Sequence, residues 1–347
     1  MAETQNLLDQ GVKEIVLLGQ NVNSYHDRTH AAAQALPQSD YTTSNEGFSN
    51  LYRLRGGAGY YFADLVEAIS TLDPELRIRF TSPHPKDYPP PLLQLMAERP
   101  NVCKQLHMPA QSGSTSVLKR MRRGYSREAY LRLIHDVKST IPDVALSSDF
   151  IAGFCGETEE EHLETISLME QISFDQAYMF AYSMRGKTHA HRAMADDVSD
   201  EIKLRRLQEI IAVFRNKVQE RNNLVEVGRL RLVLLEGQSK RSTPENPSWS
   251  GRTDQNKRVI FPMIDVLDHD LIKVLVAKND PRSILAGPKV SARAGDYVVV
   301  EIVEARGHTL RGRMLWRTSL TAYNEMNLSL AGEKTIIESI PSASRHN

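Results

Sequence analysis

Residues 1–182 alternate short apolar runs with longer amphipathic stretches. The apolar runs have the length of β-strands, and polar or turn-forming residues follow each one: Glu14–Gly19, Leu76–Thr81, Val102–Met108, Ala145–Ile151 and Asp175–Tyr182. The stretches between them have helical periodicity and are predicted as α-helices: Tyr61–Leu72, Pro91–Arg99, Ser114–Met121, Ser126–Ser139 and Glu157–Ile172. This alternation predicts parallel strands joined by right-handed crossovers. Five such strands indicate a partial α/β barrel, because the closed form has eight.

Several stretches fall outside this alternation. A helix at the start of the chain is predicted to end at Gly11, since glycine often follows the last helical turn. Residues 26–60 are rich in Ala, Ser, Thr, Gln and Gly and are predicted to form an insertion loop. Residues 263–292 look like a second insertion. The charged stretch 200–227 has a helical pattern, so we expect a helix that links two domains.

The pattern changes after residue 227. Short alternating runs are separated by Gly, Asn and Asp turns: Leu230–Leu235, Arg258–Phe261, Tyr297–Ile302 and Leu310–Leu315. Short strands with such turns predict a small β-barrel. Residues 318–347 have little apolar periodicity and are predicted to form a frayed tail. We therefore expect domains at 1–227 and 228–317, followed by the tail 318–347.

Charge is distributed unevenly between these two parts. Residues 1–227 hold 25 Lys plus Arg against 30 Asp plus Glu, a net charge of −5, whereas residues 228–317 hold 16 against 10, a net of +6. A basic segment on an acidic body indicates a polyanionic partner. No apolar run approaches the ~20 residues of a membrane-spanning helix, so we expect no membrane insertion. The first residues show no targeting segment.

Polar residues follow the predicted parallel strands, where the sites of such folds are found. They are Gly19-Gln20-Asn21, Ser82-Pro83-His84, Gln111-Ser112-Gly113-Ser114, Asp149 and Ser183-Met184-Arg185. Carboxamides and hydroxyls can hold an amino-acid moiety and ribose hydroxyls by directional hydrogen bonds. The alternative is that these residues only form turns. The segment Gly153–Thr158 fits a strand-to-helix turn as well as a ligand contact, and Cys155 within it fits an inert buried thiol.

Two groups of basic residues are candidates for phosphate contact. Lys119–Arg123 is either a solvated helix face or a phosphate-binding run. The predicted barrel carries the second group: Lys240, Arg241, Arg252, Lys257, Arg258, Arg311 and Arg313. Basic residues on a small barrel are typical of an oligonucleotide-binding surface, although scattered charges on a capping module would look similar.

Several stretches resemble motifs of the radical SAM tRNA methylthiotransferase family. Four of them match motifs at the family's second, fourth, fifth and sixth strands: Gly19–Tyr25, His107–Ser114, Ser148–Thr158 and Ser183–Arg185. Gly251-Arg252-Thr253 and Leu310-Arg311-Gly312 resemble parts of the family's TRAM domain. The similarity extends over residues 5–317. Cys155 and the string Ser183–Thr188 are closest to the animal branch.

The resemblance implies a partial radical SAM (β/α) barrel that lacks its first strand, followed by a small all-β TRAM barrel. It implies that 1–227 is a truncated radical SAM core and that 228–317 binds RNA. The implied reaction is methylthiolation of N6-isopentenyladenosine at position 37 of tRNA. The implied cofactors are S-adenosyl-L-methionine and two [4Fe-4S] clusters.

The resemblance also implies roles for individual residues. Gln20 and Asn21 would meet the methionine part of S-adenosylmethionine, and Arg185 would lie near the cofactor or the substrate. The other polar groups of the cofactor would meet Gln111, Ser112 and Asp149. The tRNA phosphates would be held by Arg252, Lys257, Arg258 and Arg311.

The cysteines of this sequence do not follow the family pattern. The family holds one cluster with C-x-x-x-C-x-x-C after the first strand and another with three N-terminal cysteines, whereas only Cys103 and Cys155 are present here. Clusters need several thiolates, so we expect no metal ligands and an activity that needs the missing cysteine region. The alternative is a non-catalytic isoform that binds RNA or a kinase activator protein. The animal relatives indicate mitochondria, and the cytoplasm stays open.

Overall fold

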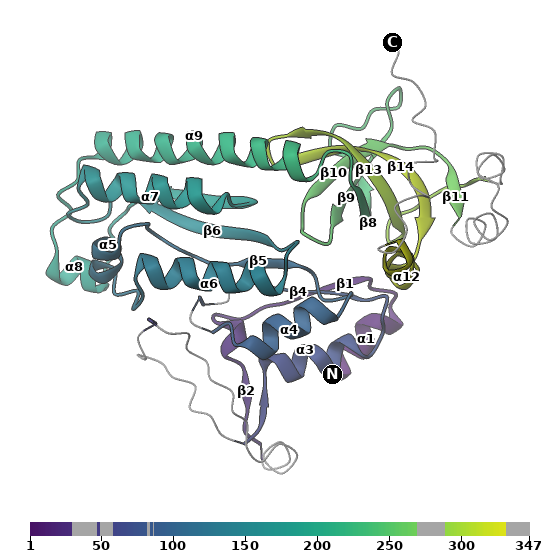
Figure 1. The fold of residues 1–347 in the computed structure, drawn as a ribbon, viewed down its shortest axis with the longest axis horizontal. Helices are drawn as coiled ribbons and strands as arrows, with labels where there is room; N and C mark the ends of the chain where they lie inside the picture. Colours follow the sequence, from purple (N-terminus) through teal and green to yellow (C-terminus); the bar gives the residue numbers. More distant parts are fainter. Residues whose placement is uncertain (30–46, 49–57, 82–83, 86, 269–288, 331–347) are drawn as a thin grey trace.

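The computed structural model describes residues 1–29, 47–48, 58–81, 84–85, 87–268 and 289–330 (Figure 1). Most of the predicted insertion at 26–60, and much of that at 263–292, lies outside these residues. The described ends of the first insertion form a short antiparallel pair, β2 (His26–Asp27) and β3 (Tyr60–Tyr61). The tail residues 331–347 also lie outside the described part of the chain.

The first part of the chain contains the five predicted parallel strands. They are β1 (Glu14–Leu17), β4 (Arg77–Phe80), β5 (Gln105–His107), β6 (Ala145–Ala152) and β7 (Gln176–Ala181). β1 pairs with β4, and β5, β6 and β7 form a three-stranded sheet, each in parallel register. A single parallel bridge between Ile78 and Val102 connects the two sheets. The partial α/β barrel expected from the sequence is therefore confirmed.

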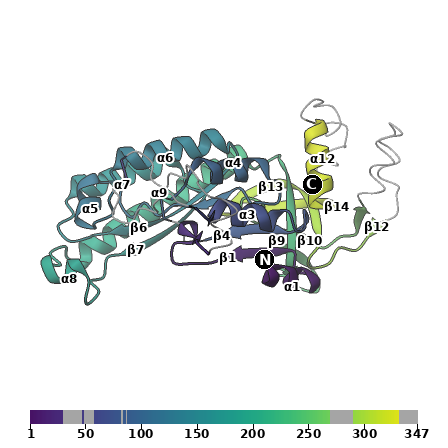
Figure 2. The same cartoon turned by 90° about the horizontal axis from the view of Figure 1, so that it is seen from below.

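Helices cover one face of these strands (Figures 1 and 2). They are α3 (Phe62–Ser70), α4 (Pro90–Glu98), α5 (Thr115–Arg120), α6 (Arg127–Thr140), α7 (Glu159–Ile172) and α9 (Asp200–Val225), whereas α1 (Ala2–Asp9) and α8 (His189–Ala193) lie outside this layer. Their apolar faces form one core with the strands, which includes Phe62, Ile78 and Phe150. The opposite face is not covered by any described helix, and its side chains Val16, Tyr178 and Phe180 are about half exposed.

The second part is a closed five-stranded β-barrel. Its strands are β8 (Leu230–Gln238), β9 (Ser248–Thr253), β10 (Arg258–Pro262), β13 (Tyr297–Arg306) and β14 (Thr309–Thr318). The order is β10-β9-β8-β13-β14, and pairing of β10 with β14 closes the barrel. β11 (Val266–Asp268) and β12 (Lys289–Val290) form a pair beside β14. The small barrel expected from the sequence is confirmed.

The segment after the barrel begins with a helix. Residues Leu320–Leu330 form α12, so the predicted frayed tail is wrong for this stretch. Glu75 accepts hydrogen bonds from the backbone N–H groups of Leu320 (2.7 Å) and Thr321 (3.0 Å), and Leu320 is buried. Because Glu75 is remote in sequence from Leu320, local periodicity could not predict that its carboxylate caps this helix. α9 ends at Val225 and β8 begins at Leu230, but the domain division at 227 stays a prediction.

Two buried arginines of β4 hold the barrel against the amino ends of the parallel strands. Arg77 donates to the backbone oxygens of Leu232 (2.9 Å) and Arg252 (2.8 Å). Arg79 donates to those of Thr253 and Asp254, both at 2.8 Å. The forked guanidinium can donate to two carbonyls at once, which an ammonium group does less well. The barrel therefore closes the amino ends of the strands and leaves the carboxyl ends free.

Candidate functional site

The carboxyl ends of the parallel strands surround a cavity of about 320 Å³. Because these ends meet at one edge of the sheet, residues far apart in the sequence come together there. The side chains that line the cavity are polar or aromatic in the main: Gln20, Thr81, His84, Pro85, His107, Pro109, Gln111, Arg123, Tyr125 and Asp149. Three of the predicted cofactor residues, Gln20, Gln111 and Asp149, are thus brought together.

Gln111 extends the sheet beyond β5. Its N–H donates to the Asp149 carbonyl (2.8 Å), and its own carbonyl accepts from Ile151 N–H (2.9 Å). Its backbone is left-handed, with φ of 67°, a conformation that costs a residue with a Cβ atom more than glycine. Strained residues of this kind are concentrated at functional sites. The strained backbone places the carboxamide where it lines this cavity and the next one.

A histidine orients the Asp149 carboxylate. Nε2 of His107 lies 3.4 Å from Oδ2 of Asp149, and Nδ1 lies 2.9 Å from Oγ of Ser147. Both side chains are partly exposed, at 16% for His107 and 29% for Asp149, so the pair faces the cavity rather than the core. A carboxylate held in this way can accept hydrogen bonds from an ammonium or hydroxyl group in a fixed direction. His107 belongs to one of the motifs that resemble the family, but no role was predicted for it.

A second cavity, of about 530 Å³, adjoins the first and shares Gln111 and Arg123 with it. Aliphatic and aromatic side chains form much of its wall: Met121, Ile151, Phe154, Phe180 and Tyr182. The Phe154 and Tyr182 rings meet edge to face, with centroids 4.8 Å apart. Arg122, Arg123 and Arg185 are among its other lining residues. An apolar wall with cations beside it can hold a planar ring that carries a negatively charged substituent.

The glycine-containing turn after β6 is built by helix packing. Gly153 has a φ of +75°, and a side chain there would overlap Lys203 of α9. Its N–H donates to Oε2 of Glu157 (2.7 Å), which also forms an ion pair with Arg206 (3.1 Å). Of the two interpretations of this segment, the structure favours a strand-to-helix turn. Phe154 alone among the residues of the turn lines the second cavity.

Comparison with known proteins gives this geometry a family context. Residues 1–169 match the model of the radical SAM superfamily. Over 312 residues the chain is 50% identical to the mitochondrial tRNA methylthiotransferase CDK5RAP1 of Homo sapiens. The aligned region covers 90% of this chain and 48% of the human protein. It is 37% identical over 313 residues to the tRNA-2-methylthio-N(6)-dimethylallyladenosine synthase of Chloroherpeton thalassium, covering 90% of this chain and 56% of that protein.

In sequence the chain is similar to radical SAM methylthiotransferases over about 90% of its length. It spans about half the length of the curated relatives that it matches. Among solved structures, coproporphyrinogen III oxidase (HemN) of Escherichia coli superposes with a TM-score of 0.38 and 20% identity over 45% of this chain and 37% of that one. In the described part of the chain, no helix is both long and apolar enough to cross a membrane.

Two residues predicted to contact the cofactor have other roles in the fold. Asn21 donates to Oδ2 of Asp87 (2.9 Å) and accepts from the N–H of His84 (3.1 Å). Ser112 is buried, and its hydroxyl lies 3.2 Å from that of Thr165 in α7. Neither residue lines the two cavities. Hydrogen bonds within the protein engage these polar groups, and the cofactor roles of both residues stay predictions.

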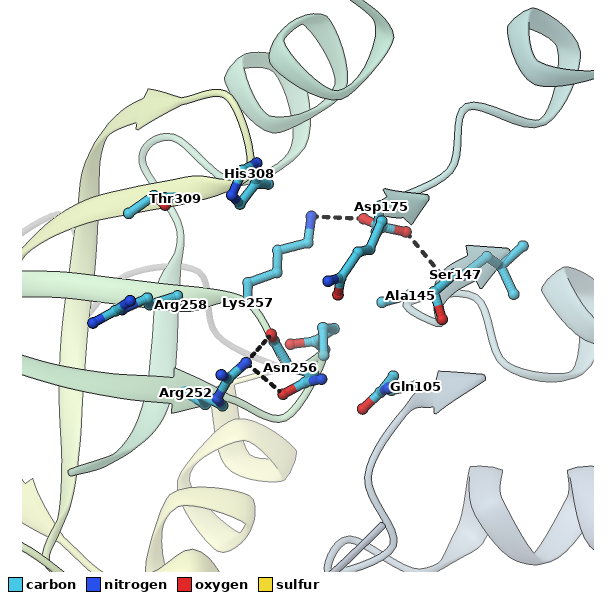
Figure 3. Close-up of a pocket in the computed structure, with 13 residues that line it drawn as sticks. Gln105, Ala145, Ser147, Asp175, Arg252, Asn256, Lys257, Arg258, His308 and Thr309 are labelled. Carbon is cyan, nitrogen blue, oxygen red and sulfur yellow. Dashed lines mark hydrogen bonds and ion pairs between the residues drawn. The ribbon is translucent and has the colours of Figure 1, made fainter. Parts of the chain in front are cut away.

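Lys257 was predicted to hold RNA, and the structure contradicts this. Its side chain is 6% exposed and extends from the barrel toward the amino end of β7 (Figure 3). The ammonium forms ion pairs with Asp175 (2.7 Å) and Glu226 (3.0 Å) and donates to Asn222. Burial and satisfied partners leave this cation no exposed surface for a phosphate. It joins the barrel to the α/β part of the chain.

The other predicted RNA contacts of the barrel lie at its surface. Arg252 forms an ion pair with Glu236 (2.8 Å) and donates to Asn256, as Figure 3 shows for the second contact. Arg258 donates to the Ser250 hydroxyl (3.1 Å). The Arg311 side chain is 52% exposed. Net charge alone therefore overstates how much of the barrel surface is free to bind a polyanion.

The two cysteines do not fit an iron–sulfur cluster. Cys103 lies at the amino end of β5 and Cys155 in the turn after β6, and both are buried. Burial raises the pKa of the Cys103 thiol to about 12, so it is not a thiolate at neutral pH. Within the described residues, no group of three His, Cys, Asp or Glu side chains could hold a metal ion. Cluster chemistry therefore has no donor set among these residues.

Proposed function

We propose that this chain contributes the cofactor-binding and RNA-binding surfaces of a tRNA methylthiotransferase that acts on N6-isopentenyladenosine at position 37. The carrying observation is the convergence of Gln20, Gln111 and Asp149 on one cavity that adjoins a second cavity with aromatic walls. Together the cavities have the size range of cofactor sites. The names of the human and bacterial relatives support this substrate and reaction.

S-adenosylmethionine fits this pair of cavities by its chemistry. The Asp149 carboxylate, oriented by His107, would accept hydrogen bonds from the methionine ammonium group. Gln20 and Gln111 would hold its remaining polar atoms, and the wall of Phe154 and Tyr182 would receive the adenine ring. When bound, S-adenosylmethionine would be a source of methyl groups; forming a radical from a further molecule would need an electron from an iron–sulfur cluster, for which the described residues hold no donor set. We propose a mitochondrial location, by analogy with the name of the human relative.

A calorimetric titration with S-adenosylmethionine tests the cofactor part of this proposal. We expect one site per chain, and Gln111→Gly should weaken binding about tenfold because a hydrogen bond to a charged group contributes ~1.5–3 kcal/mol. Glycine suits the left-handed backbone at position 111, so the fold should tolerate the change. Ser173→Gly is the matched control, since Ser173 is also left-handed but ends α7 away from both cavities.

The second candidate function is non-catalytic RNA binding, and the poor fit of the two cysteines to a cluster favours it. Under this alternative the chain binds tRNA but does not bind S-adenosylmethionine at the cavities. Retained RNA binding together with no measurable cofactor binding would therefore replace the first proposal with the second. Binding of the cofactor that Gln111→Gly leaves unchanged would refute the assigned location.

A further inference from the structure

Four arginines line the second cavity, and we call three of them the collar: Arg122, Arg123 and Arg185. Arg122 and Arg123 follow α5, and Arg185 follows β7, so two separate loops supply them. Arg122 and Arg185 are exposed and Arg123 is half-buried. Over the described ranges of the chain, no carboxylate forms a recorded ion pair with any of the three. Their charge is therefore directed at solvent and at the cavity.

The neighbouring Arg120 shows the contrast. It forms a two-pronged ion pair with Glu161 (2.9 and 2.6 Å) and donates to the backbone oxygen of Cys155 (3.1 Å). Burial alone would raise the pKa of Glu161, but its hydrogen bonds from Arg120 and Ser116 hold that pKa at about 2. Arg120 therefore clamps the turn before α7. Within the basic run 119–123, Arg120 therefore has a structural role, whereas no comparable ion pair is seen for Arg122 or Arg123 among the described residues.

Several cations of the barrel are neutralised in the same way as Arg120. Arg252 pairs with Glu236 (2.8 Å), Arg313 with Glu301 (2.6 Å), and Lys257 is buried. A phosphate that bound Arg252 or Arg313 would have to displace a carboxylate already in place. Binding at the collar requires no such displacement, so a polyanion gains more from the collar than from these paired residues.

The backbone at Arg122 is held in a conformation that favours glycine. Arg122 has a φ of 57°, and the N–H groups of Arg122 and Arg123 donate to the carbonyls of Lys119 (3.0 Å) and Leu118 (2.9 Å). These two bonds form a Schellman motif that ends α5, and glycine usually occupies the position of Arg122. Lys187, in the loop that carries Arg185, is left-handed too. Such strain is typical of functional positions.

We propose that the collar arginines bind the phosphodiester backbone of the RNA beside the nucleotide that enters the site. This inference rests on the proposed function and names the surface that captures the substrate. The charge is complementary to phosphate, and guanidinium groups bind phosphate oxygens in a two-pronged manner. The adjoining aromatic wall, with the Phe180 side chain 56% exposed, favours RNA over an acidic peptide because nucleobases stack on such rings.

The test measures binding of a fluorescent anticodon stem-loop RNA to the full chain without S-adenosylmethionine, so that loss of cofactor cannot explain the result. The triple variant Arg122→Ala, Arg123→Ala, Arg185→Ala should bind at least about tenfold more weakly. The slope of log K against log salt should become less negative by about 2–3, given ~0.7–0.9 per phosphate contact. The control triple Arg229→Ala, Arg306→Ala, Arg317→Ala on the barrel removes cations that are already paired with carboxylates, so it should change affinity less than about threefold.

A single substitution separates the effect of lost charge on RNA binding from an effect on folding stability. Arg122→Gly removes one cation and supplies the residue that the backbone prefers, so the melting temperature should stay unchanged or rise. RNA affinity should nevertheless fall. If the triple collar variant binds like the unaltered chain, or the barrel triple loses more affinity, the collar inference is wrong while the proposed function stands. Competition by polyglutamate as strong as that by unlabelled RNA would show a general anion site instead. No RNA binding by the unaltered chain would count against the proposed function itself.

Discussion

At the scale of single residues, position in the fold decides what a side chain can do. Lys257 and Arg122 are both cations in basic stretches, yet one is buried between two carboxylates and the other is exposed at a cavity. Asn21 and Ser112 have the chemistry of ligand contacts, but they bond to other parts of the protein. Residue type therefore indicates which side chains could contact a ligand, and their hydrogen-bond and ion-pair partners in the fold show which of them are free to do so.

Gly113 provides a prediction at this scale. A Cβ atom there would lie 2.6 Å from the Thr165 Cα in α7, which is backbone that cannot move aside. Gly113→Ala should therefore destabilise the protein by ~1–3 kcal/mol through overpacking. Gly186→Ala, where nothing lies within 4 Å, is the matched control and should be neutral or mildly stabilising. Equal melting temperatures for the two variants would contradict the steric argument.

At the scale of elements, α9, β7 and the barrel meet in a buried network of charges. Lys257 lies between Asp175, just before β7, and Glu226, just after α9. Burial alone would raise the pKa of both carboxyls, but the cations outweigh it. Lys257 and Arg221 hold the pKa of Asp175 below 3.8, and Arg231 and Lys257 hold that of Glu226 below 4.5. The network therefore stabilises the fold while both carboxyls are charged.

Removing Lys257 should have an effect that depends on pH. Because the folded pKa values are depressed, the stabilisation is present above the unfolded values and is lost as pH falls through the folded ones. Lys257→Met should cost ~1.5–3 kcal/mol near pH 7, since it removes one cation from two buried carboxylates that keep Arg221 and Arg231 as partners. Urea unfolding should show this cost shrinking below about pH 4 as the carboxyls take up protons. The exposed Lys240→Met is the control, and a cost that is constant with pH would contradict the account.

Sequence periodicity predicted elements well where they are long and locally determined. The five parallel strands and the helices α6, α7 and α9 follow directly from apolar spacing. The short helix α8 and the capped helix α12 were missed, because α8 has five residues and α12 depends on Glu75, far away in the chain. Polar residues that follow parallel strands were expected to meet at one site, and Gln20, Gln111 and Asp149 do line one cavity. The burial of Lys257 was not predictable, since its partners Asp175 and Glu226 are remote in sequence.

At the scale of the whole molecule, the barrel is fixed to the core through hydrogen bonds from β4. Arg77 and Arg79 are buried, and their guanidinium groups donate to four carbonyls of barrel residues. Tyr297 of β13 adds a bond to the Glu75 carbonyl (2.9 Å). The two parts should therefore unfold together.

The double substitution Arg77→Leu, Arg79→Leu tests this coupling. It removes charged hydrogen bonds that contribute ~1.5–3 kcal/mol each and leaves barrel carbonyls without donors. Calorimetry should show one transition for the unaltered chain and two for the variant, because the barrel retains its own closed core. Arg99→Leu, which removes only a partly exposed pair with Glu67, should keep the single transition. A single transition in the double variant would contradict the argument.

The barrel and the cavities lie at opposite ends of the same parallel strands. Arg77 and Asp175 belong to the amino ends, whereas Gln111 and Arg185 belong to the carboxyl ends. Changes that adapt the collar to a different RNA need not disturb the contacts that hold the molecule together. Directed evolution could therefore draw its libraries from the two loops that follow α5 and β7, and leave the barrel contacts fixed. New RNA preferences would then be open to selection without a parallel search for restored stability.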